Sequence, residues 1–241
     1  MTPGARVRRL QDSHAYALVL LFVAVSVAVT LAAPDDAWSR LIVVALQGAT
    51  LLVALTTSGA RRGLRRVAFV LVVAAVVGSA IALVATDGEG TRAGVRAVTL
   101  ALVVLAPAVL VAGIYRDIRA TGGVPLRAVF GVVAIYLLVG MAFGVGHQIL
   151  ADVGSGTYVK GVGDPDAQDF LYFSYITLTT VGYGDIVPVS NVARTVAVLE
   201  ALTGQLYLVT IVAVIVTNVG RRRPTDAGPR PSEGAGDQSS R

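Results

Sequence analysis

The sequence predicts an all-α membrane protein with six transmembrane helices and a short re-entrant helix and loop between the fifth and the sixth. Of its 241 residues, 55% are hydrophobic and only 15% are charged, and the mean hydropathy is +0.73. A soluble domain carries about 25% charged residues. The composition therefore indicates a chain that lies in a lipid bilayer.

Six apolar stretches account for the predicted helices. A helix needs about 20 mostly apolar residues to cross the hydrocarbon core. The stretches that reach or approach this length are residues 16–33, 41–55, 67–85, 95–114, 126–150 and 192–219, of which the second is the shortest. We divide the chain into a four-span N-terminal membrane domain (1–120), a second membrane domain (121–220) and a tail (221–241).

The placement of basic residues predicts the orientation. With the N-terminus inside, 15 basic residues fall on inside segments and five on outside segments. Cytoplasmic loops carry the excess of Lys and Arg, so both termini are expected in the cytoplasm of a plasma membrane protein. The preference for arginine over lysine, with abundant Ala, Val and Gly, suggests a bacterial source.

The tail is rich in Arg, Pro, Gly and Ser and has no apolar period. Such a segment cannot bury enough surface to fold, so we expect it to be disordered. Its first three residues, Arg221, Arg222 and Arg223, would lie at the inner membrane face, where anionic lipid attracts basic side chains.

Composition also limits the chemistry. The chain has no cysteine and only two histidines, His14 and His147, which leaves little for a metal centre or acid–base catalysis. We expect no cofactor, no enzymatic activity and no nucleic-acid partner. An intramembrane hydrolase using Ser79 and His147 is the alternative from another class, but no nucleophile-elbow pattern surrounds Ser79 and no third group is evident.

The segment between the fifth and sixth spans carries the most informative motif. Residues 169–185 read DFLYFSYITLTTVGYGD, and the turn-like Asp164-Pro165-Asp166 precedes them. The first part reads as a helix too short to span, so it must re-enter the membrane. Non-helical backbone at this depth is stable only where it lines a water-filled path or is buried in protein.

The residues after this helix resemble the potassium channel pore family. The matching residues are Thr179, Thr180, Val181, Gly182, Tyr183, Gly184 and Asp185, followed by Pro188. The resemblance covers roughly residues 126–219 and is highly specific, because the motif lies between two spans as the family requires. It implies a re-entrant pore helix and a selectivity filter between helices five and six, in a homotetramer that closes the ring.

The resemblance also implies roles for individual residues. It assigns K⁺-binding backbone carbonyls to Thr180, Val181, Gly182 and Tyr183, with the Thr180 hydroxyl at the inner end, and K⁺ as the permeant ion. Gly184 completes the filter, and Thr179 and Asp185 support it. Five acids around the motif would raise the cation concentration at the entrance, or are simply polar loop residues: Asp152, Asp164, Asp166, Asp169 and Asp185.

Physical chemistry explains the residue types in the motif. A dehydrated K⁺ needs oxygens in place of its water shell, and backbone carbonyls can supply them. Successive carbonyl groups point towards one axis only if the backbone alternates between right-handed and left-handed conformations. Gly182 and Gly184 can adopt the left-handed conformation, with positive φ, without steric cost. A non-selective cation pore of the same fold is the alternative, against which the VGYG residues argue.

Four polar or flexible positions lie near the motif. Glu200, deep in the sixth span, is predicted to brace the pore helix through Thr177, Thr179 and Thr180, or to be a protonated structural residue. Gly204 is either a gating hinge or a close-packing residue. Gln205 faces a central cavity or bonds a neighbouring helix. His147 is either an external pH sensor or an interfacial hydrogen-bonding residue, and we favour the latter.

The fourth span differs from that of voltage-gated channels. Its interior has no basic residue between Arg96 and Arg116, and Pro107 predicts a kink. We therefore expect a channel that is not strongly voltage-gated.

Overall fold

The computed structural model describes residues 3–58, 60, 62–85, 89–121 and 126–219, which form seven helices and one two-stranded ladder. The elements are α1 (Pro3–Ala32), α2 (Ala37–Thr57), α3 (Arg62–Ala85), α4 (Glu89–Thr121), α5 (Leu126–Val153), β1 (Val159–Lys160), α6 (Ala167–Leu178), β2 (Val187–Pro188) and α7 (Asn191–Val219). In this part of the chain, six helices are long and apolar enough to cross a membrane. The predicted all-α membrane fold with six spans is therefore confirmed.

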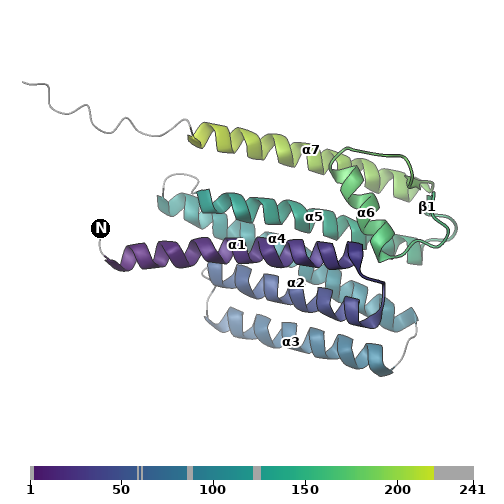
Figure 1. Cartoon of the computed structure of the whole chain (residues 1–241), viewed down its shortest axis with the longest axis horizontal. Coiled ribbons are helices and arrows are strands. Elements are labelled where there is room, and N and C mark those ends of the chain that lie inside the picture. Colours follow the sequence, from purple (N-terminus) through teal and green to yellow (C-terminus); the bar gives the residue numbers. More distant parts are fainter. Residues whose placement is uncertain (1–2, 59, 61, 86–88, 122–125, 220–241) are drawn as a thin grey trace, which may run out of the picture.

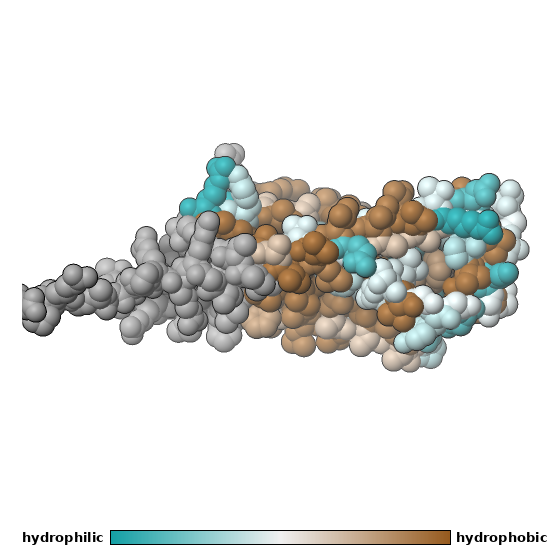
Figure 2. All heavy atoms as spheres, turned by 90° about the horizontal axis from the view of Figure 1, so that it is seen from above, coloured by the Kyte–Doolittle hydropathy of each residue, from teal (hydrophilic) through white to brown (hydrophobic). Residues whose placement is uncertain are grey.

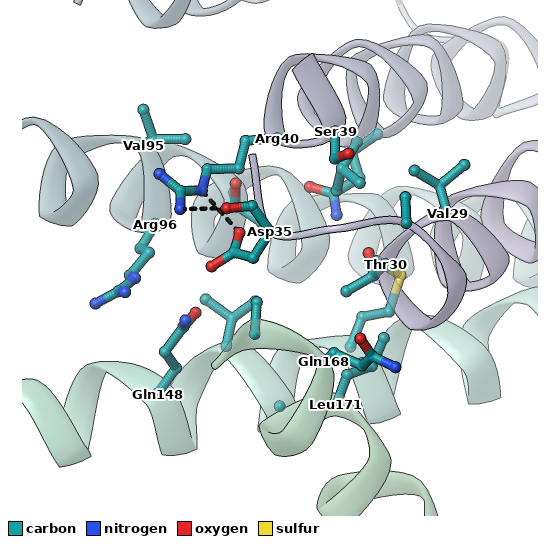
Figure 3. Close-up of a pocket in the computed structure, with 18 of the residues that line it drawn as sticks. Val29, Thr30, Asp35, Ser39, Arg40, Val95, Arg96, Gln148, Gln168 and Leu171 are labelled. Carbon is teal, nitrogen blue, oxygen red and sulfur yellow. Dashed lines mark hydrogen bonds and ion pairs between the residues drawn. The ribbon is translucent and has the colours of Figure 1, made fainter. Parts of the chain in front are cut away.

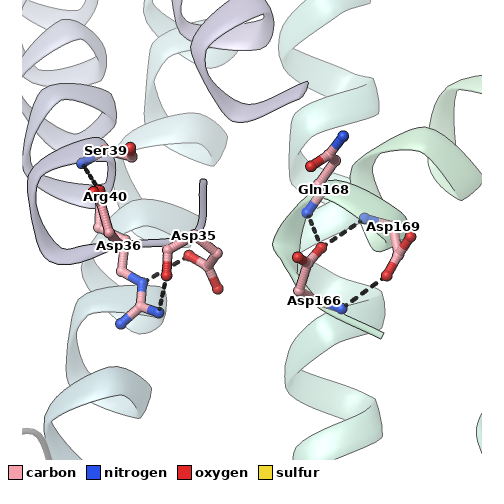
Figure 4. A network of polar contacts seen from close by, with 7 residues as sticks. All are labelled: Asp35, Asp36, Ser39, Arg40, Asp166, Gln168 and Asp169. Atoms are coloured by element: carbon pink, nitrogen blue, oxygen red, sulfur yellow. Dashed lines mark hydrogen bonds and ion pairs between the residues drawn. The ribbon is translucent and has the colours of Figure 1, made fainter. Parts of the chain in front are cut away.

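The helices extend beyond the apolar stretches that predicted them. The second span, predicted over 41–55, is a 21-residue helix. Its start is fixed by Asp36, whose carboxylate accepts a 2.8 Å hydrogen bond from the backbone N–H of Ser39 (Figure 4). Such a cap satisfies a donor that the first turn cannot pair, and hydropathy does not report it. The short ladder between β1 and β2 is likewise not signalled by hydropathy.

The long helices pack side by side, and α1 begins at the same end of the bundle at which α7 ends (Figure 1). The helix α3 packs against α2 and α4 at one edge, whereas α7 packs against α5 and α6 at the other. The helix α6 lies near the end that carries β1. Figure 2 shows apolar surface over the middle of the bundle and hydrophilic residues towards this same end.

Tyr16 joins the N-terminal helices to α5. Its ring is 1% exposed and lies where a β-carbon on Gly131 of α5 would come within 2.9 Å. Its hydroxyl lies against Gly113 of α4 in the same way, at 3.3 Å. The two glycines therefore let one buried aromatic side chain of α1 contact both α4 and α5, and the four-span region packs directly on the helix that precedes α6.

Candidate pore and selectivity filter

The pore helix α6 begins with a capping box. The Asp166 carboxylate accepts hydrogen bonds from the backbone N–H groups of Gln168 and Asp169, at 2.8 and 3.1 Å. In return, the Asp169 carboxylate accepts from the backbone N–H of Asp166 at 3.1 Å (Figure 4). These bonds fix the first residue of a helix that is only 12 residues long. The turn predicted at Asp164–Asp166 is thus where the helix starts.

Small residues on α5 let α6 approach closely. A β-carbon on Gly140 would collide with the ring of Tyr175, and one on Gly144 would lie 3.1 Å from the Cα of Leu171. The Tyr175 hydroxyl donates a 2.7 Å hydrogen bond to the backbone carbonyl of Leu137, also on α5. Spacing of four residues places Gly140 and Gly144 on one face of α5, so the pore helix is seated in a shallow groove.

In the loop after α6, residues with positive backbone φ alternate with residues that do not have positive φ. Thr180, Gly182 and Gly184 have φ values of 61°, 53° and 80°, whereas the residues between them do not have positive φ. The positive φ expected at Gly182 and Gly184 is therefore confirmed. Thr180 was not expected to share it, since a residue with a β-carbon in this region is strained. Alternation over consecutive residues is the geometry that turns successive carbonyls towards one side.

Hydrogen bonds hold the inner end of this loop to the end of α6. The backbone N–H groups of Val181 and Gly182 both donate to the carbonyl of Ile176, at 2.9 and 3.0 Å. The Thr179 hydroxyl donates to the carbonyl of Tyr175 at 2.6 Å, and its role as filter support stays a prediction. The loop therefore continues directly from a helix that is itself fixed against α5.

The outer end of the loop is held by a second set of contacts. The Tyr172 hydroxyl donates to the Asp185 carboxylate at 2.6 Å, and this bond lowers the pKa of Asp185 and raises that of Tyr172 to about 12. The strands β1 and β2 pair antiparallel, with Val159 opposite Pro188. Gly161, at φ 108°, lies so close to the Asp185 carbonyl that no side chain would fit between them. Tyr172 and Gly161 are thus supports for the filter that the sequence did not reveal.

A buried polar network lies behind the pore helix and joins three helices and the segment before β1. Glu200 on α7 contacts His147 on α5 at 3.0 Å and also contacts the Ser174 hydroxyl on α6. The other ring nitrogen of His147 lies 2.8 Å from the hydroxyl of Tyr158, just before β1. Ser174 lies 2.7 Å from the carbonyl of Gly140. The side chains of His147 and Glu200 are completely buried.

One assignment of protons satisfies every bond in this network. The Ser174 hydroxyl carries one proton but contacts two acceptors, the Gly140 carbonyl and the Glu200 carboxyl. Both contacts are hydrogen bonds only when Ser174 donates to Gly140 and a protonated Glu200 donates to Ser174; His147 then donates to Glu200 and accepts from Tyr158. An ionised Glu200 would instead take the single hydroxyl proton of Ser174 and leave the Gly140 carbonyl without that donor. Burial also raises the pKa of Tyr158 to about 12, which keeps its hydroxyl available as a donor. A neutral network avoids the cost of burying separate charges.

These contacts correct the predicted partners of Glu200. The carboxyl bonds Ser174 and His147, not the threonines at 177, 179 and 180, because Glu200 lies beside the middle of α6 and α7 reaches the end of α6 only one turn later, at Gly204. His147 is buried within the protein and makes two hydrogen bonds, so its predicted hydrogen-bonding role is confirmed, whereas its position at the membrane interface stays a prediction. Two rare polar residues in separate spans usually pair with each other, and this was the signal available in the sequence.

Gly204 lies where α7 meets the end of the pore helix. A β-carbon there would collide with the backbone carbonyl oxygen of Leu178, the last residue of α6. This contact supports the close-packing interpretation, whereas a hinge at Gly204 stays a prediction. Gln205 is exposed in the single chain, and its position in a cavity also stays a prediction.

Most of the acids around the motif have structural partners. Asp152 forms an ion pair with Arg96, and Asp166, Asp169 and Asp185 make the contacts given above. They fix helix ends and the filter exit, and their effect on the local cation concentration stays a prediction.

Comparison with known proteins places this unit in a family. A family model described as "Ion channel" matches residues 129–221. The calcium-gated potassium channel TvoK of Thermoplasma volcanium is 51% identical over 45 residues, 19% of this chain and 13% of that protein. The inward rectifier potassium channel Kirbac3.1 of Paramagnetospirillum magnetotacticum is 28% identical over 90 residues, 37% of this chain and 29% of that protein. Protein LctB of Bacillus caldotenax is 32% identical over 106 residues, 42% of this chain and 75% of that protein. The chain spans less than a third of the length of the first two relatives. No solved structure matches the chain significantly.

Two spans that enclose a short re-entrant helix and a loop of alternating φ define the pore unit of a membrane channel. The chain belongs to the ion channel family, and the resemblance to potassium channel pores drawn from its filter motif is confirmed. The family excludes the hydrolase alternative, since its members are channels and not enzymes. In agreement, both ring nitrogens of His147 are engaged by Tyr158 and Glu200 and are not available to Ser79.

Proposed function

We propose that this chain is one subunit of a homotetrameric, K⁺-selective channel that conducts K⁺ passively across a bacterial plasma membrane. The observation that carries the proposal is the loop of alternating φ at residues 179–185, which is exposed throughout in the single chain. Val181 and Tyr183 are 51% and 73% exposed. A loop that is left uncovered in the single chain has room for neighbouring subunits, and rotational symmetry closes such loops into a ring around one axis.

The proposed ion sites follow from the chemistry of the loop. In the tetramer, the carbonyl oxygens of Thr180, Val181, Gly182 and Tyr183 replace the water around K⁺, with the Thr180 hydroxyl at the inner end. Gly184 completes the filter, and the contacts of Thr179 and Asp185 support its two ends. The channel needs no cofactor, because the backbone itself supplies the ligands.

The named relatives favour potassium over a non-selective pore. TvoK, Kirbac3.1 and Two-pore potassium channel 1 of Arabidopsis thaliana, which is 37% identical over 83 residues, all carry potassium in their names. The VGYG residues of this chain agree with that assignment. The second candidate is a non-selective cation channel, which would have the same fold.

Orientation and domain roles are part of the proposal. Both termini lie in the cytoplasm, which the arginine placement and the shared end of α1 and α7 support (Figure 1). Residues 1–120 form a four-span domain and residues 121–220 form the pore domain. The proposed anionic lipid contacts of Arg221, Arg222 and Arg223, and the tail itself, lie outside the described residues.

Reconstitution tests the proposal directly. Purified protein in liposomes should show K⁺ flux that Ba²⁺ blocks, with far lower Na⁺ flux, and native mass spectrometry should show four chains. Equal K⁺ and Na⁺ permeability would favour the non-selective pore. Conduction by a monomer, or a stable assembly with a number of chains other than four, would contradict the proposed tetrameric ring.

A further inference from the structure

A cavity at the outer end of the bundle lies between the N-terminal helices and the pore helix (Figure 3). Its walls come from α1, α2 and α4 on one side and from α5 and α6 on the other. The pore helix contributes Ala167, Gln168 and Leu171. None of these residues belongs to the filter, so the cavity is a feature that ion conduction does not explain.

Gln47 is the most informative residue in the wall. Its side chain is 2% exposed, and within the described part of the chain neither its amide nitrogen nor its amide oxygen has a hydrogen-bond partner. Buried polar groups are almost always paired, so a side chain with two unpaired groups of opposite character requires an explanation. A ligand group that both donates and accepts a hydrogen bond, such as a hydroxyl, would satisfy both atoms.

The outer part of the same cavity is positively charged. Arg40, Arg92 and Arg96 line it together with a single acid, Asp35. Asp35 pairs with Arg40, and Arg96 pairs with Asp152, as Figure 3 shows for the first pair. Among the described residues, Arg92 forms no ion pair and is exposed. This end of the cavity therefore favours an acidic group.

The distance between the arginine-lined end of the cavity and Gln47 determines the length of a ligand that could contact both. Arg40 and Gln47 lie on α2 and are separated by seven residues, about 10 Å along the helix axis. The lining is mainly but not wholly apolar, and its apolar residues include Val43 from α2, Val95 from α4 and Met141 from α5. The inner end would be a poor environment for an alkyl chain, because the methyl end would leave the Gln47 amide unpaired.

We propose that this cavity is a binding site for a compact amphipathic acid about 10 Å long, such as a phenolic carboxylate. The acidic group lies near Arg92, the apolar ring fills the middle, and the hydroxyl exchanges hydrogen bonds with Gln47. Because Gln168 and Leu171 of α6 line the site, a bound ligand also contacts the helix that carries the filter. Through this contact a bound ligand would change ion conduction. Only this consequence rests on the proposed channel function.

Binding is measured on the full chain in nanodiscs of zwitterionic lipid, by equilibrium dialysis with labelled para-hydroxyphenylacetate. Two analogues each lack one group: para-methylphenylacetate lacks the hydroxyl, and para-hydroxyphenylethanol lacks the acid. Octanoate represents a lipid-like acyl chain. We expect saturable binding of the hydroxy acid, about tenfold tighter than that of each of the other three probes.

Two substitutions test which group of the ligand binds at each end of the cavity. Gln47→Met keeps the size of the side chain and should remove the preference for the hydroxyl over the methyl probe. It should also raise the melting temperature of the free protein, since it removes an unpaired buried group. Arg92→Gln should remove the preference for the acid over the alcohol. The matched control is Arg194→Gln, which changes an exposed arginine on α7 and should leave both preferences intact.

Three results would overturn the proposal. Absence of saturable binding in a folded protein would mean that water alone occupies the site, and tighter binding of octanoate would identify a lipid chain as the occupant. Unchanged preferences in Gln47→Met and Arg92→Gln would place the probe elsewhere. Binding without any effect on ion flux would leave the site in place and remove only its link to conduction.

Discussion

The carboxyl group of Glu200 on α7 lies 3.0 Å from Nε2 of His147 on α5, and both side chains are completely buried. Glu200 also contacts Ser174 on the pore helix, so one residue joins the three helices that hold the filter. The contact with Tyr158 continues the network towards β1. Because these elements are far apart in sequence, the network fixes their relative positions and not merely the ends of one helix.

The first prediction tests how Glu200 supports the pore. Glu200→Gln keeps an acceptor for His147 and a donor for Ser174, whereas Glu200→Ala leaves Nε2 of His147 unpaired and removes one of the two contacts of Ser174. An unpaired buried polar group costs about 1–3 kcal/mol. We expect Ala to lower the dissociation temperature of the assembly and the K⁺ flux much more than Gln does, as measured by heating followed by gel filtration and by liposome flux.

Infrared spectroscopy provides a separate readout of the same residue. A protonated Glu200 should give a carboxylic acid band that is missing from Glu200→Gln. Equal and mild effects of the two substitutions, with no such band, would show that the residue is tolerated and not a brace.

The second prediction separates packing from hinge motion at Gly204. Gly204→Ala places a methyl group against the Leu178 carbonyl, and overpacking of this kind costs about 1–3 kcal/mol. We expect lower thermal stability and altered K⁺ over Na⁺ selectivity, because the strain acts on the end of the pore helix. Gly78→Ala is the matched control, since no atom lies within 4 Å of its added β-carbon. Normal stability and selectivity with a changed open probability would instead identify a hinge.

Local patterns in the sequence predicted the spans and the filter well, because hydropathy and the residues at 179–185 are read along the chain. The partners of Glu200 could not be found in this way, since Ser174 and His147 are brought to it only by the packing of α5, α6 and α7. The same applies to Gly204, whose constraint is a carbonyl on another helix. The unpaired amide of Gln47 is also a property of tertiary packing and has no signal in the sequence.

The third prediction concerns the backbone of the filter. Gly182 has φ 53° and no atom within 4 Å of an added β-carbon in the single chain, so Gly182→Ala is opposed by conformation and not by a clash. A left-handed conformation costs a residue with a β-carbon about 1–2 kcal/mol. We expect the variant to lose K⁺ flux or K⁺ over Na⁺ selectivity in liposomes. Gly146→Ala on α5, which is equally free of contacts, should conduct normally. A normal selectivity ratio in Gly182→Ala would remove the basis for the proposed ion sites.

The fourth prediction concerns external acid. The hydrogen bond from Tyr172 lowers the pKa of Asp185 below its usual 3.8. The stabilisation from this contact is therefore present above the usual pKa and is lost only as the pH falls through the lowered value. We expect flux to be insensitive to Asp185 titration at neutral and mildly acidic pH. Tyr172→Phe should move the onset of acid inhibition to higher pH, as measured by flux against external pH, whereas Tyr115→Phe on α4 should not. An identical pH profile in Tyr172→Phe would show that this bond does not control the filter exit.

The fifth prediction is that the open probability depends only weakly on voltage. The helix α4 is continuous from Glu89 to Thr121, and no basic residue lies between Arg96 and Arg116. These two arginines are separated by about 30 Å along the helix and therefore lie near opposite membrane faces. A charge that never crosses the field does no electrical work.

The packing of α4 agrees with a static role. Arg96 is held in an ion pair with Asp152 at the end of α5, and Val103 and Leu110 are fully buried against neighbouring helices. Moving one charge through 100 mV supplies about 2.3 kcal/mol, and steep gating requires three or four charges per subunit. Bilayer recordings should give a shallow activation curve that Arg96→Gln and Arg116→Gln leave unchanged. A curve equivalent to more than about four gating charges per tetramer would show that α4, or another charged segment, moves through the field.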